Sequence, residues 1–255
     1  MSDGVIIKNV AGLHKDKSAD SELISQAIMG QTVGIEKDEG DWLYVQTWDT
    51  YHGWIQSRWV NRSIPKTDAT VTSLFADALK TPNPNGEIWT KLVITTSLDM
   101  IDENNGFAHV RLPDGKEAWI LNEHVSLDAG ESTEIIQTAK RFLGVPYLWG
   151  GTTPFGLDCS GFVQLVYKIH NIMLLRDAHI QASDPQAIPV EKQNLMPGDL
   201  VFFAGGEKIT HVGMACGDGT FIHSTGKGVG VTINSLDDEP YACNYVGGRR
   251  MLKGL

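Results

Sequence analysis

The sequence predicts an α+β protein in which two small β-barrels precede one α+β domain. Three observations lead to this prediction: an internal repeat in the first half, alternating apolar residues within each copy, and helical spacing followed by strand-like runs in the second half. At 255 residues, the chain is long enough for two domains of average size or for three small ones.

The repeat appears when the chain is shifted by 65 positions along itself. Phe107 then falls on Trp42 and Trp119 falls on Trp54, with no gap between them. The two copies are predicted to occupy residues 1–63 and 64–127. Because large aromatic side chains in small domains are mostly buried, we expect Trp42, Trp54 and Trp119 to belong to the two cores.

Each copy contains runs of strand length in which apolar and polar residues alternate. Turn signals containing glycine separate these runs at 39–41, 104–106 and 113–115. Several short strands within about 60 residues must curl over to bury a core, so each copy is predicted to form a small β-barrel.

A different pattern begins after Gly130 and defines a predicted third domain over 131–255. Apolar residues at helical spacing predict a helix over 135–143, with Ser132 or Thr133 as its N-cap and Gly144 at its end. A second helix is expected to follow Cys159. Strand-like runs then follow at 200–203, 211–215 and 220–223, which together favour an α+β domain.

Composition and charge exclude several classes of partner. The net charge is −10, and an acidic surface repels nucleic acids and anionic lipid, so neither is expected as a partner. Three cysteines are too few for a disulfide scaffold. The N-terminal residues lack the basic and apolar regions of a signal peptide, which predicts a cytoplasmic protein if Met1 is the native start.

Cys159 is the strongest candidate for a reactive group, because it lies at the turn that opens the second helix of the third domain. Helix N-terminal N–H groups stabilise anions and are expected to lower the pKa of its thiol. His211 and His223 flank a Gly-Asp-Gly turn at 217–219. A hairpin closed by this turn places His223 opposite Gly213, with both histidines on one face as potential base and orienting group.

Other interpretations of these residues remain open at this point. Spacing alone is weak evidence, since a single cysteine is more often inert packing, as we expect for Cys216 and Cys243. A metal site built from Cys159, His211 and His223 is a further alternative, although the spacing matches no common zinc motif. We therefore expect no metal and no cofactor.

Five ordered motifs give the third domain a family resemblance. It resembles the NlpC-type cysteine peptidases of bacterial cell-wall metabolism, which have a compact papain-like fold. The aromatic and apolar pattern around Trp54 also resembles bacterial SH3-like domains. The five motifs are Tyr147-Leu148-Trp149-Gly150-Gly151, Asp158-Cys159-Ser160-Gly161-Phe162, Pro197-Gly198-Asp199-Leu200-Val201-Phe202-Phe203, His211-Val212-Gly213 and Ile222-His223-Ser224.

The resemblance implies a role for each motif residue. Cys159 would be the nucleophile, His211 the general base and His223 the orienting residue. The Tyr147 hydroxyl would stabilise the oxyanion together with the backbone N–H of Cys159. The residues implied to line the substrate pocket are Asp158, Ser160, Trp149, Arg176 and Asp177, of which Asp158 could instead be only an N-cap.

Two SH3-like copies before the peptidase domain are typical of a subgroup of γ-D-glutamyl-L-diamino-acid endopeptidases. That resemblance implies a stem-peptide substrate, L-Ala-γ-D-Glu-diamino acid, with Glu22 and Tyr51 reading its free N-terminal amine. The implied role is the recycling of cell-wall peptides. Alternatives are an amidase or acyltransferase that uses the same Cys-His site, or an inactive binding module. The sequence does not fix the oligomeric state.

Overall fold

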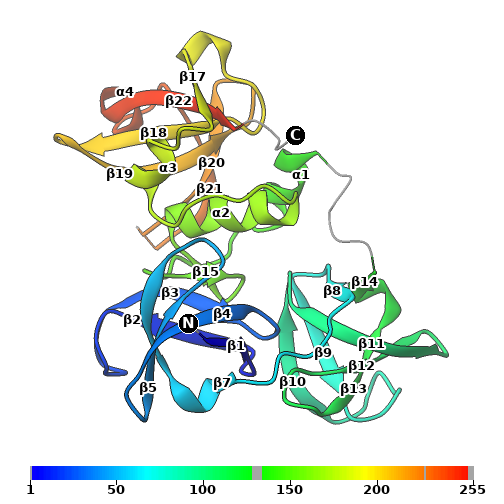
Figure 1. Cartoon of the computed structure of the whole chain (residues 1–255). Coiled ribbons are helices and arrows are strands. Elements are labelled where there is room, and N and C mark those ends of the chain that lie inside the picture. Colours follow the sequence, from blue (N-terminus) through cyan, green and yellow to red (C-terminus); the bar gives the residue numbers. More distant parts are fainter. Residues whose placement is uncertain (1, 128–133, 227, 252–255) are drawn as a thin grey trace. The chain divides into compact units, whose positions relative to one another are not determined.

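The computed structural model describes residues 2–127, 134–226 and 228–251 (Figure 1). The chain divides into two compact units, residues 1–129 and 130–255. The first unit holds both copies of the repeat, and the second holds the predicted α+β domain. No helix in the described ranges is long and apolar enough to cross a membrane.

Copy 1 is a seven-stranded antiparallel sheet in the order β3-β2-β6-β5-β4-β1-β7. Its strands are β1 (Ser2–Ile6), β2 (Val10–His14), β3 (Leu23–Ile28), β4 (Thr32–Asp38), β5 (Trp42–Gln46), β6 (His52–Gln56) and β7 (Val60–Asn61). Copy 2 has the corresponding order, β10-β9-β13-β12-β11-β8-β14. Its strands are β8 (Ala69–Val71), β9 (Phe75–Leu79), β10 (Ile88–Val93), β11 (Ser97–Asn104), β12 (Phe107–Arg111), β13 (Glu117–Leu121) and β14 (Val125–Ser126).

The predicted repeat is confirmed strand by strand. The bounds of β2, β3, β5, β6 and β7 recur 65 positions later in β9, β10, β12, β13 and β14. The turns repeat as well, because left-handed backbone conformations occur at the same offset even where the residue type changes. These matched positions are Gly30 and Thr95, Gly40 and Asn105, and Thr50 and Gly115.

The prediction that the three tryptophans are core residues is wrong. Trp42, Trp54 and Trp119 are half-buried, because each faces outward on a strand whose neighbouring residue faces inward. Ile55, beside Trp54, is fully buried instead. Trp119 stacks on the ring of His109 with centroids 4.1 Å apart, so these aromatic side chains pack on the outer face of each sheet.

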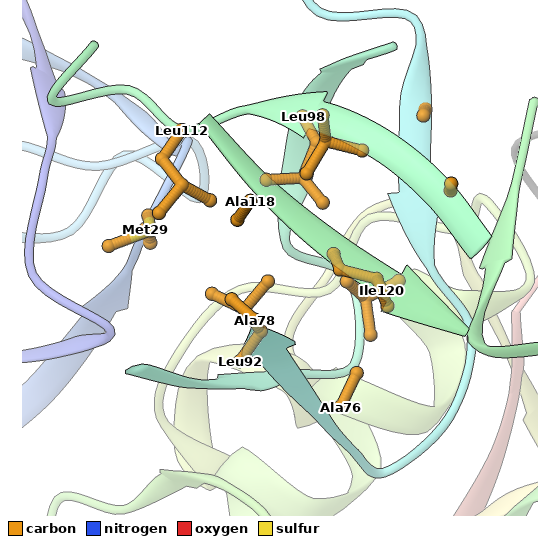
Figure 2. Close-up of a cluster of buried hydrophobic side chains, with 12 residues drawn as sticks. Met29, Ala76, Ala78, Leu92, Leu98, Leu112, Ala118 and Ile120 are labelled. Atoms are coloured by element: carbon orange, nitrogen blue, oxygen red, sulfur yellow. The ribbon is translucent and has the colours of Figure 1, made fainter. Parts of the chain in front are cut away.

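The two copies share part of one core. Met29, from the turn after β3, belongs to a buried cluster with Leu92, Leu98 and Leu112 of copy 2 (Figure 2). A Cβ atom on Gly30 would lie 2.2 Å from the carbonyl oxygen of Ser97, so only glycine permits this approach. Copies 1 and 2 therefore pack as a single unit.

The second unit is an α+β domain built on a six-stranded antiparallel sheet, in the order β17-β22-β18-β19-β20-β21 (Figure 1). The strands are β17 (Ala187–Val190), β18 (Leu200–Gly205), β19 (Lys208–Ala215), β20 (Thr220–Thr225), β21 (Gly230–Ser235) and β22 (Tyr245–Met251), and a small hairpin is formed by β15 (Thr152–Thr153) and β16 (Gly156–Leu157). The helices are α1 (Ile135–Lys140), α2 (Cys159–Ile169), α3 (Ala178–Ala182) and α4 (Tyr241–Asn244).

Two details of the predicted helices differ from the structure. The first helix is shorter than expected and ends at Lys140, with Glu134 at its N-cap position. Ser132 and Thr133, the expected N-caps, lie outside the described residues. The chain then reverses at Gly144, whose φ of +82° is the left-handed conformation expected after a helix.

Candidate active site

Cys159 is the first residue of α2, and the preceding Asp158 fixes where this helix begins. The Asp158 carboxylate accepts a hydrogen bond from the backbone N–H of Gly161 at 2.7 Å, which is the contact of an N-cap. Along the helix, Phe162, Val163 and Val166 are fully buried. Capping at its N-terminus and burial of most of its residues fix the position of α2 and thus of the thiol.

Two motif glycines, Gly151 and Gly161, bring the loop before α2 against the helix. A Cβ atom on Gly161 would lie 2.2 Å from the carbonyl oxygen of Gly151, and one on Gly151 would lie 2.3 Å from that of Gly156. Since real Cβ atoms do not approach so closely, any side chain would push this loop away from Cys159. The glycines of the WGG and DCSGF motifs therefore have a steric role.

The two histidines meet through the predicted hairpin, whose register is confirmed. Met214 of β19 pairs with Ile222 of β20, and Ala215 pairs with Phe221. This register brings the Nε2 atom of His211 to 2.7 Å from the Nδ1 atom of His223. A Cβ atom on Gly213 would lie 3.0 Å from the Cβ of His223, so the glycine of the His-Val-Gly motif leaves room for that imidazole.

Asn234 completes the polar chain, and sequence reasoning missed it. It lies on β21 opposite Phe221, and its Oδ1 atom is 2.9 Å from the Nε2 atom of His223. His223 is fully buried, so both of its ring nitrogens find their partners inside the protein. The signal that could have found Asn234 is the position of a polar residue on the strand that pairs with the histidine strand.

The pKa of the thiol differs from the sequence expectation. Burial, followed by the neighbouring Asp158 carboxylate, raises the pKa of Cys159 to about 11. The backbone N–H groups of Val212 and Ser160 lower the pKa, but burial outweighs them. The hydrogen bond from the Val212 backbone also places the sulfur against β19, the strand that carries His211.

Both histidines are held neutral. Burial lowers the pKa of His211 to about 3, with a smaller contribution from His223, and burial lowers the pKa of His223 to about 4. At neutral pH these shifts favour the protonated thiol of Cys159 and the uncharged form of both imidazoles. A neutral imidazole can accept the thiol proton, as a general base must.

Tyr147 lies within electrostatic range of the thiol. Burial first, and then the charges of Cys159 and Asp158, raise the pKa of its phenol to about 12. The hydroxyl therefore stays protonated at neutral pH and can donate a hydrogen bond. Its ring packs near Gly226, where an added Cβ would lie 3.5 Å from the ring carbons.

Arg176 and Asp158, both expected to line the substrate pocket, form a buried ion pair. Arg176 is only 2% exposed and donates to both carboxylate oxygens of Asp158. The same carboxylate also accepts from the N–H of Gly150 and from the Ser160 hydroxyl. Asp158 therefore caps α2 and is held in place by Arg176 and by the N–H of Gly150.

Comparisons with known proteins show the family to which the chain belongs. The model of the NlpC/P60 family matches residues 144–250, and that of a bacterial dipeptidyl-peptidase Sh3 domain matches residues 13–58. A γ-D-glutamyl-L-lysine dipeptidyl-peptidase of Bacillus cereus is 31% identical over 91% of this chain and 76% of its own. The chain belongs to the NlpC/P60 family of cysteine peptidases.

Two further relatives extend the likeness to the whole chain. Dipeptidyl-peptidase 6 of Lysinibacillus sphaericus is 30% identical over 93% of both chains. The crystal structure of an NlpC/P60 family protein from Bacillus cereus superposes with a TM-score of 0.87 at 27% identity, covering 99% of this chain and 100% of that chain. The fold class predicted from sequence, an NlpC-type domain after SH3-like copies, is confirmed.

The remaining candidate residues of this NlpC/P60 peptidase lie in different places. Trp149 is 62% exposed, beside the loop that Asp158 holds. Asp177 is half-buried at the N-cap position of α3. Glu22 and Tyr51 belong to copy 1, just before β3 and β6. Because His14 at the end of β2 pairs with both of these strands, Glu22 and Tyr51 lie at the same end of copy 1.

The alternative metal site gains no support from the geometry. Across residues 2–127, 134–226 and 228–251, no group of three or more His, Cys, Asp or Glu side chains is arranged to hold a metal ion. His223 is engaged through both ring nitrogens, which leaves it no lone pair for a ligand bond.

Proposed function

We propose that this peptidase hydrolyses the γ-D-Glu–L-diamino-acid amide of peptidoglycan stem peptides that carry a free N-terminal L-Ala. The observation that carries the proposal is the hydrogen-bonded His211–His223 pair together with the Cys159 thiol, which lies against the Val212 backbone on the strand that carries His211. This arrangement occurs in a chain that is 31% identical to a γ-D-glutamyl-L-lysine dipeptidyl-peptidase.

The reaction would begin when Cys159 attacks the γ-carbonyl carbon of D-Glu while its proton passes to His211. The backbone N–H of Cys159 and the Tyr147 hydroxyl would stabilise the oxyanion, at about 3 kcal/mol for each donor. The C–N bond then breaks, and the departing amine of the diamino acid takes the proton from His211. Water, deprotonated by His211, finally hydrolyses the thioester and releases L-Ala-D-Glu.

Recognition of the free amine is assigned to copy 1. A carboxylate at Glu22, assisted by Tyr51, would pair with the ammonium of L-Ala. An N-acylated or sugar-linked peptide would bring an uncharged group to that carboxylate in place of the ammonium, which disfavours binding. Trp149 and Asp177 are proposed to line the pocket, while Asp158, Ser160 and Arg176 hold the loop and helix that shape it.

A preference for free amines suits a cytoplasmic enzyme that recycles short wall-derived peptides. Stem peptides joined to glycan have no free L-Ala amine and would be poor substrates. The partner of the protein is accordingly a small peptide, with either diaminopimelate or lysine as the diamino acid.

The test compares L-Ala-γ-D-Glu-diaminopimelate with its N-acetylated form, in wild type and in Glu22→Gln. Wild type should cleave the free peptide at least about tenfold faster, because the acetylated form has no ammonium to pair with the Glu22 carboxylate. Glu22→Gln should remove most of this difference. The repeat supplies the control, since Glu87 occupies the matching place in copy 2 and pairs with Lys80 as Glu22 pairs with Lys15.

Glu87→Gln should therefore leave the preference intact. Equal wild-type rates on the two peptides would reject the role of the free amine. If the preference for the free peptide is unchanged in Glu22→Gln, Glu22 is not the residue that recognises the free amine.

A further inference from the structure

Asn234 is hydrogen-bonded to His223 at the ring nitrogen that His211 does not contact, and the mechanism above does not use it. It pairs with Phe221 across β20 and β21, and directly paired residues share a face of a sheet. Phe221 and His223 lie two residues apart, so they also share that face. The backbone register alone therefore delivers the Asn234 amide to His223, where its Oδ1 atom is 2.9 Å from Nε2.

We propose that Asn234 is a positioning residue that sets the tautomers of both histidines. An amide oxygen can only accept, so His223 must carry its proton on Nε2. The Nδ1 atom of His223 then accepts a hydrogen bond from His211 Nε2–H, at 2.7 Å. This leaves the lone pair of His211 on Nδ1, free to take the proton of Cys159.

The opposite orientation of the Asn234 amide would exchange the hydrogen-bond donor and acceptor roles of the ring nitrogens in both histidines. If the NH₂ group faced His223, Nε2 would be the acceptor and Nδ1 would carry the proton. His211 would then accept through Nε2 and carry its own proton on Nδ1. An imidazole in that tautomer has no lone pair for the thiol, so the orientation of one amide decides whether His211 can act as a base.

An uncharged acceptor suits this role better than a carboxylate. The titratable groups whose rings contact His223 are His211 from β19 and Tyr241 from α4, and both are neutral at pH 7. A carboxylate at position 234 would favour protonated His223. Protonated His223 donates through both nitrogens and would force His211 into the wrong tautomer.

The direct test is nitrogen-15 NMR of the imidazole rings in the free protein at pH 7. We expect protonated Nε2 and unprotonated Nδ1 in both His211 and His223. Protonated Nδ1 in either ring would overturn the proposal. Because no substrate is present, the outcome does not depend on which amide bond the enzyme cleaves.

Variants supply the second readout, kcat and KM on the stem peptide together with the iodoacetamide labelling rate of Cys159. Asn234→Leu removes the acceptor and should lower kcat and labelling at least about tenfold with little change in KM, since a wrong tautomer disables the base. Asn234→Asp should keep activity at high pH and move the acid limb of the pH profile upward. The matched control is Thr232→Val, which alters the residue opposite His223 but leaves the bond to Nε2.

Wild-type kcat and labelling in Asn234→Leu would contradict the assignment. An equal loss in Asn234→Leu and Asn234→Asp at every pH would also contradict it, since a merely structural residue gives that pattern. The assignment rests on Cys159 and His211 as the reacting pair. Failure of the proposed peptide specificity would leave both the NMR and the labelling results interpretable.

Discussion

Burial controls the ionisation of the reactive residues. Cys159 begins a helix, which favours a thiolate, yet desolvation and the Asp158 charge raise its pKa to about 11. Desolvation lowers the pKa values of His211 and His223. The residue types and the helix start could be predicted from sequence, whereas the direction of the thiol shift could not, because it depends on how much protein surrounds the sulfur.

The buried imidazole of His223 predicts a loss of stability on the acid side. Its pKa is about 4 in the folded protein against 6.5 ordinarily, so below pH 6.5 the unfolded chain takes up a proton that the folded chain does not. The free energy of unfolding should fall as the pH drops from about 6.5 to 4. The contribution approaches about 1.4 kcal/mol per pH unit within that window.

The measurement is urea unfolding of wild type and His223→Gln at a series of pH values, followed on the second unit. The variant cannot titrate at this position and should lose stability less steeply below pH 6.5. Parallel curves for the two proteins would show that His223 is not held neutral by burial.

Individual elements show where sequence patterns suffice. The β19–β20 hairpin was predictable in register because a three-residue turn fixes which residues pair, and this placed His223 opposite Gly213. The return of β22 to pair with β18 was not predictable, since it joins strands distant in sequence. The role of Asn234 was not predictable for the same reason, because only the pairing of β21 with β20 brings its side chain to His223.

Gly213→Ala tests whether the glycine on β19 is needed to leave space for the His211–His223 pair. The new methyl group would lie 2.6 Å from the Phe221 ring and 3.0 Å from the Cβ of His223, so the imidazole must move. We expect about 1–3 kcal/mol lower stability from overpacking and roughly 100-fold lower kcat from the misplaced base. Thermal unfolding and steady-state kinetics measure the two effects.

Gly205→Ala, on neighbouring β18, is the control for adding a methyl group to this sheet. Its nearest neighbour is the Thr210 hydroxyl at 3.3 Å, which can adjust. We expect nearly wild-type kinetics there. Full activity in Gly213→Ala would show that the glycine is not required for the position of His223.

At the scale of the whole molecule, the chain combines a repeated β unit with a peptidase unit. The 65-residue repeat was visible in sequence because its strands kept both their spacing and their aromatic residues. The shared core around Met29 was not predictable from sequence. Met29 lies in a turn, and only the packing of copy 2 against copy 1 buries it. Likewise, the buried Asp158–Arg176 pair joins residues whose sequence pattern suggested a substrate surface.

The central claim is that Cys159 cleaves the γ-D-Glu–diamino-acid bond, and mass spectrometry of the products tests it most directly. With L-Ala-γ-D-Glu-diaminopimelate, wild type and the control Cys216→Ala should both release L-Ala-D-Glu and free diaminopimelate. Cys159→Ala should release neither while remaining folded. Cleavage at another bond, an acyl-transfer product in place of hydrolysis, or wild-type turnover by Cys159→Ala would contradict the claim.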